Sequence, residues 1–228
     1  MIKQAIILAG GLGTRLRSVV SGVPKCMAPV KGKPFLHYVI NHLQKEGIEE
    51  FIFSLGYKSE SIIDYLNQSS MINYQLSIEK EPLGTGGAIK LACEKVRNKN
   101  VIIVNGDTLF SVSATSLCEF HEQHHADCTL CLKPMKDFDR YGVVELNVDS
   151  SVKSFKEKKY YKKGLINGGV YALNVENFRN KKFPEHFSFE KDYLEKFVGT
   201  EKIFGIEQDK YFIDIGVPED YKRAQEEL

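Results

Sequence analysis

The stretch LAGGLGTRLRSVVSGVPKCMAP, residues 8–29, decides the fold because it places a glycine-rich loop directly after a short apolar run. Residues 4–8 are expected to form a buried strand. The glycines that follow it are Gly10, Gly11 and Gly13. Without side chains, they let backbone N–H groups approach a polyphosphate, and Arg15 and Lys25 add positive charge. The stretch therefore predicts a phosphate-binding loop at the end of the first strand of an α/β fold.

Two familiar glycine loops do not fit this stretch. A Walker loop needs a lysine directly after its final glycine, but Lys25 stands twelve residues beyond Gly13. A dinucleotide fingerprint needs a glycine at position 16, which is Leu16. A plain turn between strand and helix is the remaining alternative, and it does not require Thr14, Arg15 and Lys25 beside the glycines. The stretch therefore favours a phosphate-binding loop that is neither a Walker loop nor a dinucleotide fingerprint.

The rest of the first half alternates strands and helices. The expected strands are 50–55, 74–78 and 101–104. Pro34 opens a helix that Gly47 closes, Ser59 caps a short helix to Leu66, and the glycines at 84–87 begin a helix to about Val96. The apolar face of the first helix consists of Phe35, Leu36, Val39, Ile40 and Leu43. This alternation is typical of a parallel sheet with helices on both faces.

The second half changes to shorter strands. They are expected at 129–132, 142–146, 152–155, 168–173 and 211–215, with a hairpin turn at 149–151. Helices are expected over 114–125, from a Ser188 cap to Phe197, and from Pro218 to the end. We predict an α/β fold with a doubly wound, mixed and mainly parallel Rossmann-like sheet and a smaller antiparallel part. The chain would form one domain, 1–228, with nucleotide bound by about 1–110 and sugar by about 111–228.

Composition excludes several classes of partner. The 31 Lys and Arg residues nearly balance 30 Asp and Glu, so the net charge of +1 attracts neither nucleic acid nor an anionic membrane. The apolar run at 5–9 is too short for a signal peptide or a membrane span. We expect a globular protein of the cytoplasm. Its oligomeric state stays open, a homo-oligomer included.

Five scattered cysteines do not form a secreted disulfide framework. Cys128 and Cys131 follow His124 and His125, and this spacing resembles half of a zinc site. Residues 127–133 alternate like a strand, however, which would direct the two thiols to opposite faces. We therefore expect core packing and no zinc.

A carboxylate stands at the end of the central strand 101–104. Asp107, in Asn105-Gly106-Asp107, lies where oxygen ligands hold Mg²⁺ against triphosphate oxygens. A solvated acid at a strand end is the alternative. The glycine loop in the same chain favours the metal.

Gly-Gly-x-Gly-Thr-Arg-Leu, followed by Pro-Lys and then Pro, resembles the signature of nucleotidyltransferases that activate sugar 1-phosphates. The resemblance spans nearly the whole chain. It implies that Arg15 and the glycine loop hold a nucleoside triphosphate and that Lys25 bridges phosphates at the reacting centre. It also implies a second metal ligand, Asp214, before Gly216. Cys26 departs from the pattern, because close relatives often have proline there, and this should change loop stiffness more than chemistry.

The segment EKEPLGTGGAI, residues 79–89, is similar to the base-recognition loop of that family in its guanylyltransferase form. Guanine presents two adjacent donors, N1–H and the exocyclic amine, and either Glu79 or Glu81 could accept both. The choice between these two acids stays open, and a surface acid beside a helix start is the alternative for each. The resemblance thus implies this nucleotide-binding set: Leu8, Ala9, Gly10, Gly11, Gly13, Thr14, Arg15, Lys25, Glu79, Glu81, Gly84 and Thr85.

The resemblance also carries sugar contacts over to the second half. They are Gly142, Glu157, Lys158 and Asn167, with Glu157 accepting from hydroxyls and Lys158 pairing with the phosphate. The other lysines of 156–163 are expected to be solvated. Catalytic roles fall to Arg15, Lys25 and Asp107, and metal ligation to Asp107 and Asp214.

Four shorter segments narrow the resemblance to D-glycero-α-D-manno-heptose 1-phosphate guanylyltransferases. It is carried by Leu16-Arg17-Ser18-Val19-Val20, Met27-Ala28-Pro29, the segment FDRYG at 138–142 and the segment FIDIGVPEDY at 212–221. The implied reaction is in-line attack of a sugar 1-phosphate on the α-phosphorus of GTP with Mg²⁺, giving GDP-heptose and pyrophosphate. The enzymatic alternatives are mannose 1-phosphate as acceptor, or a uridylyl or thymidylyl transfer. The non-enzymatic alternative is a regulatory relative that binds nucleotide sugar without turnover. The presence of Lys25, Asp107 and Asp214 together argues against this alternative.

Overall fold

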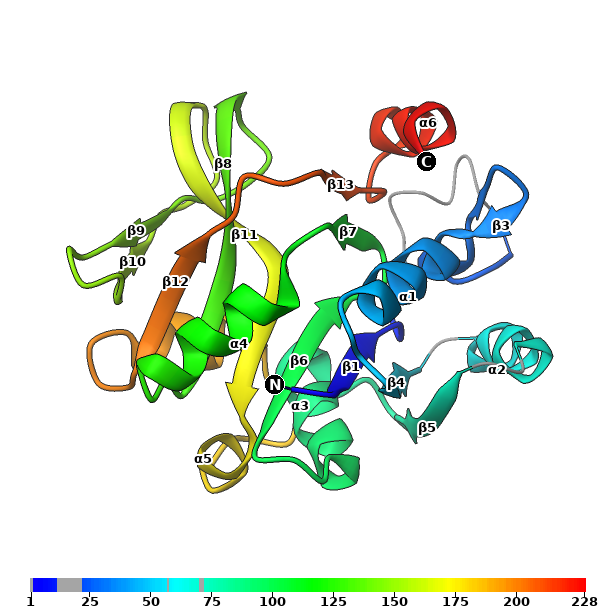
Figure 1. Ribbon diagram of the computed structural model, residues 1–228, viewed down its shortest axis with the longest axis horizontal. Helices are drawn as coiled ribbons and strands as arrows, with labels where there is room; N and C mark the ends of the chain where they lie inside the picture. Colours follow the sequence, from blue (N-terminus) through cyan, green and yellow to red (C-terminus); the bar gives the residue numbers. More distant parts are fainter. Residues whose placement is uncertain (1, 12–21, 57, 70–71) are drawn as a thin grey trace.

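A mixed sheet runs through the centre of the molecule (Figure 1). The computed structural model describes residues 2–11, 22–56, 58–69 and 72–228, and within them seven strands share this sheet in the order β12-β8-β11-β6-β1-β4-β5. Its strands are β1 (Gln4–Leu8), β4 (Glu50–Leu55), β5 (Asn73–Ile78), β6 (Asn100–Asn105), β8 (Cys128–Phe138), β11 (Tyr161–Asn174) and β12 (Ile203–Glu207). The pairs β6–β1, β1–β4, β4–β5 and β12–β8 are parallel, and β11 is antiparallel to both β6 and β8.

Shorter strands pair beside this sheet. They are β2 (Pro29–Val30) with β3 (Lys33–Pro34), β7 (Thr108–Phe110) with β13 (Phe212–Asp214), and β9 (Val144–Leu146) with β10 (Val152–Phe155). The α-helices are α1 (Phe35–Lys45), α2 (Ser59–Gln68), α3 (Gly84–Ala92), α4 (Ala114–Gln123), α5 (Val175–Arg179) and α6 (Pro218–Glu227). The remaining helical turns are η2 (Lys25–Met27), η3 (Cys93–Lys95) and the π-helical η4 (Phe189–Glu195).

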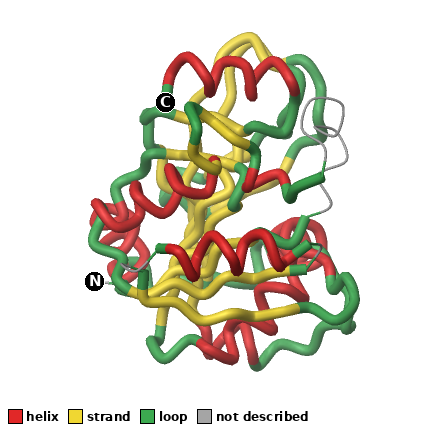
Figure 2. The backbone as a smooth tube through the Cα atoms, turned by 90° about the vertical axis from the view of Figure 1, so that its right-hand side faces the viewer, coloured by secondary structure: helices red, strands yellow, loops and turns green. Residues whose placement is uncertain are grey.

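Helices cover both faces of the sheet, as the sequence predicts. Alternate residues of the central strands belong to two separate buried clusters: in β1, Ile7 packs in one and Ile6 in the other. Helices α1, α2, α4 and α6 contribute to the first cluster, and α3, α5 and η4 to the second. Figure 2 shows the strands running between helices. The predicted doubly wound, mainly parallel architecture is therefore confirmed.

Local sequence explains the first helix well. All five predicted apolar residues of α1 are buried, and Pro34 precedes its first turn. At the other end Gly47 has φ +86°, its N–H donates to Gln44, and that of Ile48 donates to Leu43. These two bonds form a Schellman motif, in which glycine accepts the left-handed conformation without strain. The helix thus begins and ends where its proline and glycine place it.

Several elements differ from the expectations. β8 and β11 are longer than the predicted 129–132 and 168–173 and extend beyond the rest of the sheet as an antiparallel pair (Figure 1). β7, α5 and β12 are not predicted at all. Ser59 is the first residue of α2 and not its cap, because Lys58 takes the capping position with φ +54°. Ser188 caps as predicted, through its side chain and the N–H of Lys191, but the helix that it caps is π-helical.

The cysteines pack in the core. Cys128 belongs to one buried cluster and Cys131 to the other, so the two thiols point to opposite faces of β8. This confirms the strand interpretation, since ligands on opposite faces cannot share a metal. Among the described residues, no helix has the length and apolar content that crossing a bilayer requires.

Candidate active site

A pocket of about 400 Å³ lies at the carboxyl ends of four neighbouring parallel strands, β6, β1, β4 and β5. The chain passes from β1 outward to β4 and β5 and then returns to β6 on the other side of β1. In sheets of this kind, the crevice at such a reversal is the usual ligand site. The pocket is lined by Leu8, Ala9, Gly10, Gly11, Lys25, Cys26, Ser54, Glu79, Pro82, Gly84, Thr85, Ala88, Asn105, Asp107 and Glu190.

Glycines allow the strand ends around the pocket to approach one another. A Cβ on Gly10 would lie 3.0 Å from the backbone N of Gly56 and 3.2 Å from Oε1 of Glu79. A Cβ on Gly106 would lie 2.9 Å from the carbonyl oxygen of Leu8, which accepts the Gly106 N–H at 2.8 Å. A side chain at either position would push β1 away from its neighbours. Both glycines therefore shape the pocket floor.

Lys25 and Asp107 form an ion pair beside this floor. The ammonium of Lys25 lies 2.5 Å from Oδ2 of Asp107, and their side chains are 13% and 29% exposed. Lys25 begins η2, whose next residue, Cys26, is buried. Burial and the charge of Asp107 raise the pKa of the Cys26 thiol to about 12, so Cys26 is not a thiolate nucleophile near neutral pH. Lys25 is the cation that η2 presents to the pocket.

Asp214, the second predicted metal ligand, lies next to Asp107. Its strand β13 pairs with β7, and the N–H of Ile215 donates to the backbone oxygen of Asp107 at 3.1 Å. Burial, and then the charge of Asp107, raise the pKa of Asp214 above its ordinary value. Two carboxylates that repel each other in this way, with hard oxygen donors, suit a divalent cation.

The donor set at this point fits Mg²⁺. Mg²⁺ usually takes one or two protein carboxylates and completes its shell with water and phosphate oxygens. Within residues 2–11, 22–56, 58–69 and 72–228, no cluster of three or more His, Cys, Asp and Glu side chains could hold a metal ion. Asp107 and Asp214 stay the predicted protein ligands, and a bound triphosphate would supply the others.

The two candidate base-reading acids occupy different surroundings. Glu79 lines the pocket, accepts the N–H of Leu83 at 2.8 Å through Oε2, and has a pKa raised by burial. Glu81 is exposed and does not line the pocket. Glu79 is thus the acid whose carboxylate a base in this pocket could reach.

The glycines of the second cluster, 84–87, pack against the segment before η4. Gly84 has φ +74°, and a Cβ there would lie 2.6 Å from the carbonyl oxygen of Phe187. That oxygen accepts the N–H of Gly86, and a Cβ on Gly86 would lie 2.2 Å from the Phe187 ring. The cluster therefore closes one wall of the pocket by contact with a segment about a hundred residues later in the chain.

The predicted sugar-binding residues lie outside this pocket lining. Gly142 approaches the carbonyl oxygen of Lys156, which a Cβ would meet at 2.4 Å. Glu157 and Lys158 are exposed between β10 and β11. The amide of Asn167 is engaged within its own strand, since it donates to the Tyr171 hydroxyl and accepts the N–H of Gly169. Their assignment to the sugar stays a prediction.

Sequence reasoning missed three polar residues that line the pocket: Ser54 on β4, Asn105 and Glu190. Asn105 ends β6, and a Cβ on Gly169 would lie 2.5 Å from its amide nitrogen. Glu190 accepts from the hydroxyls of Thr85 at 2.8 Å and Ser188 at 3.1 Å. Asn105 had a local signal, because it stands beside Asp107 at a strand end. Glu190 had none, since only the folded chain brings η4 to the pocket. Gly13, Thr14 and Arg15 lie outside the described residues.

Comparisons with known proteins agree with this geometry. The family model for nucleotidyl transferases matches residues 4–228. The chain is 54% identical to the D-glycero-α-D-manno-heptose 1-phosphate guanylyltransferase of Aneurinibacillus thermoaerophilus, over 99% of this chain and 98% of that protein. It is 46% identical to the enzyme of the same name from Campylobacter jejuni, over 96% of each chain.

A solved structure gives the same result. The crystal structure of HddC from Yersinia pseudotuberculosis complexed with GMP-PN superposes with a TM-score of 0.89 at 38% identity, and 99% of each chain is covered. Both the sequence match and the superposition extend over nearly the whole chain. The chain therefore belongs to the nucleotidyl transferase family, as its glycine-rich stretch predicts.

Proposed function

We propose that this nucleotidyl transferase moves GMP from GTP to D-glycero-α-D-manno-heptose 1-phosphate, with Mg²⁺, and releases pyrophosphate. The observation that carries the proposal is the 54% identity, over almost all of both chains, to an enzyme that bears this name. The pocket supports it independently, because the glycine-lined end of β1, Lys25 and Asp107 line it, and Asp214 lies beside Asp107 at its edge through the pairing of β13 with β7. Chemistry on a nucleoside triphosphate commonly uses a positioned cation, backbone N–H groups and carboxylates that hold a divalent metal.

The choice of guanine rests on Glu79. Its carboxylate lines the pocket beside Gly10 and the start of α3, where a base could stack over the backbone. One carboxylate can accept both the N1–H and the amine of guanine. Adenine and the pyrimidines do not offer this pair of adjacent donors. The crystal structure of HddC with GMP-PN supports a guanine nucleotide in a relative.

In the proposed reaction, an oxygen of the sugar 1-phosphate forms a bond to the α-phosphorus of GTP while the bond from that phosphorus to the bridging oxygen of the β-phosphate breaks. Pyrophosphate takes the electron pair and leaves. Lys25 would hold its ammonium against the phosphate oxygens, and the strand-end N–H groups at Gly10 and Gly11 would orient the triphosphate. Asp107 and Asp214 would hold Mg²⁺, which supplies positive charge to the triphosphate when bound. No group of the protein needs to form a covalent intermediate.

Pyrophosphate release, measured over a panel of substrates, tests the proposal. GTP, ATP, UTP and dTTP would each be combined with the 1-phosphates of D-glycero-α-D-manno-heptose, mannose and glucose, with Mg²⁺ and with EDTA in its place. We expect release above background for GTP with the heptose phosphate, a much slower reaction with mannose 1-phosphate, and none with EDTA. Faster turnover of UTP or dTTP would overturn the base assignment, and faster turnover of mannose 1-phosphate the sugar assignment. Nucleotide-sugar binding without any release would favour a regulatory protein.

A further inference from the structure

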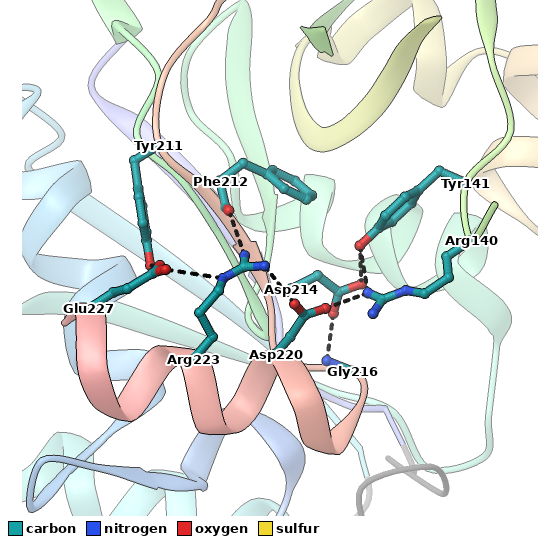
Figure 3. A network of polar contacts seen from close by, with 9 residues as sticks. All are labelled: Arg140, Tyr141, Tyr211, Phe212, Asp214, Gly216, Asp220, Arg223 and Glu227. Carbon is teal, nitrogen blue, oxygen red and sulfur yellow. Dashed lines mark hydrogen bonds and ion pairs between the residues drawn. The ribbon is translucent and has the colours of Figure 1, made fainter. Parts of the chain in front are cut away.

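A chain of polar contacts links the loop before β9 to the carboxylate of Asp214 and to α6 (Figure 3). The loop contributes Arg140 and Tyr141, and the first turn of α6 contributes Asp220. These residues belong to the two segments FDRYG and FIDIGVPEDY, which the fold brings together although about seventy residues separate them. The contacts therefore join the predicted sugar side of the site to its predicted metal side.

Asp220 is the anchor of this chain of contacts. It is only 9% exposed, and each of its oxygens accepts from a different guanidinium. Oδ2 lies 2.5 Å from Nη2 of Arg140, and Oδ1 lies 2.8 Å from Nη1 of Arg223. A buried carboxylate with two arginine partners holds its geometry firmly, because guanidinium and carboxylate are both planar and both charged. Asp220 thus fixes the position of the Arg140 guanidinium.

Tyr141 carries the contact from Arg140 to Asp214. Nη2 of Arg140 donates to the Tyr141 hydroxyl at 3.0 Å, and this hydroxyl donates to Oδ2 of Asp214 at 3.5 Å. Because the hydroxyl accepts from the guanidinium, its own proton is directed to the carboxylate. The other oxygen of Asp214 accepts the N–H of Gly216 at 2.8 Å. Both carboxylate oxygens are therefore oriented by donors of the protein.

The Tyr141 ring is held as well. It meets the ring of Phe212 edge-on, with the two ring centroids 6.0 Å apart. The Arg140 guanidinium lies 5.4 Å from the centroid of the Tyr141 ring. Phe212 stands two residues before Asp214 on β13. The same strand therefore supports the ring that packs against Tyr141 and the carboxylate that its hydroxyl contacts. This packing leaves the hydroxyl few alternative directions.

We propose that Arg140 and Asp220 are positioning residues, which act through the Tyr141 hydroxyl to orient Asp214 for a divalent cation. The inference rests on the proposed function, since it assumes that Asp214 is a metal ligand. Donors behind a ligating carboxylate fix its direction, and losing them typically weakens metal binding by about 10- to 100-fold.

A structural clamp on α6 is the competing explanation, and Arg223 separates the two. Arg223 binds the same carboxylate, donates to the carbonyl of Phe212 at 3.2 Å and pairs with Glu227 at 3.4 Å, but it makes no hydrogen bond or ion pair with Tyr141 or Asp214. Arg223→Gln therefore removes the same charge from Asp220 as Arg140→Gln while leaving the tyrosine contact in place. It is a matched control for the loss of an arginine.

The experiment measures Mn²⁺ binding to the full-length protein without nucleotide, from the EPR signal of the free ion. We expect the dissociation constant for Mn²⁺ to rise about tenfold or more in Arg140→Gln and in Tyr141→Phe, and to stay within about twofold of the parent in Arg223→Gln. Thermal unfolding of each variant, followed by circular dichroism, shows whether the protein is folded at the temperature of the titration. Tyr141→Phe keeps the ring and removes only the hydroxyl, so it tests the relay even where an arginine variant unfolds.

Unchanged Mn²⁺ affinity in folded Arg140→Gln and Tyr141→Phe would overturn the inference. So would an equal loss in Arg223→Gln, or the absence of Mn²⁺ binding to the parent. The outcome is distinct from that of the pyrophosphate assay. If the variants show the expected order but GTP and the heptose phosphate give no pyrophosphate, the proposed function fails and the positioning of Asp214 stands.

Discussion

The ammonium of Lys25 lies 2.5 Å from Oδ2 of Asp107, although 82 positions separate the two residues in the chain. Lys25 lies in the glycine-rich stretch, and Asp107 follows the central strand β6. The pair is mostly buried, since only 13% of the lysine side chain and 29% of the aspartate side chain are exposed. Asp107 therefore keeps a positive charge at the point where phosphates would bind.

Lys25→Ala should lower the turnover number for pyrophosphate release by about a hundredfold or more, because a positioned charge at the reacting phosphate would be lost. The fold should persist, since the change removes no apolar core residue. Lys80→Ala, at an exposed lysine that does not line the pocket, is the control and should retain the parent rate. Near-normal turnover in Lys25→Ala would remove Lys25 from the mechanism.

Local patterns predicted the elements whose identity depends on their own residues. β1 and β6 are continuous apolar runs, and α1 carries its own proline, apolar stripe and terminal glycine. β12 was not predictable in this way. Its sequence IFGIE becomes a strand by parallel pairing with β8 at the sheet edge, a partner more than seventy residues away. β7 has three residues and exists as a strand because β13 pairs with it.

The residues of the site divide in the same way, into those that local sequence predicts and those that depend on distant parts of the chain. The glycines, Lys25 and Asp107 could be found because each stands directly after a strand or in a recognisable motif. The exposure that distinguishes Glu79 from Glu81 depends on how β5 ends against β1 and β4, which no local pattern specifies. Glu190 reaches the pocket through its contact with Thr85, 105 positions earlier in the chain.

Glu79→Gln should lower kcat/KM for GTP by about 10- to 100-fold, the range that corresponds to the loss of a hydrogen bond to a charged group. Glutamine keeps an oxygen that can accept the Leu83 N–H, so the start of α3 should remain intact. The glutamine amide has only one acceptor oxygen and carries no charge, so it cannot accept both guanine donors as a carboxylate can. Steady-state pyrophosphate release at varied GTP measures the effect.

Glu81→Gln is the matched control for this variant, because the two acids are two positions apart and only Glu79 lines the pocket. Glu81→Gln should change kcat/KM for GTP by no more than about twofold, as exposed substitutions usually do. The reverse order of the two variants would assign base recognition to Glu81.

Gly86→Ala should destabilise the protein by about 1 to 3 kcal/mol, because its Cβ would overlap the Phe187 ring and the wall of the pocket would have to shift. Gly11→Ala provides the contrast, since a Cβ there meets no atom of the described residues within 4 Å. Urea unfolding of both variants measures the free energies. A second change, Phe187→Leu, should recover part of the loss in Gly86→Ala, and failure to do so would mean that the ring is not the cause.

His121 should make stability fall in mild acid. The residue is 1% exposed, its Nδ1 lies 2.9 Å from the Thr129 hydroxyl, and burial lowers its pKa from 6.5 to about 4. The charge of Asp127 opposes this shift and that of Lys99 adds to it. Between pH 6.5 and 4 the unfolded chain binds a proton that the folded chain does not, so the free energy of unfolding falls as pH falls through this window.

The shift from 6.5 to about 4 corresponds to about 3 kcal/mol, present above pH 6.5 and lost near pH 4. Urea unfolding at pH 7.5, 6, 5 and 4 would measure it. His121→Gln cannot bind this proton in either state, so its stability should depend on pH less steeply than that of the parent. His125→Asn removes an exposed histidine four residues later, at a position with φ +46° that asparagine tolerates, and should keep the parent slope. Equal slopes in the parent and His121→Gln would show that the acid sensitivity arises at other groups.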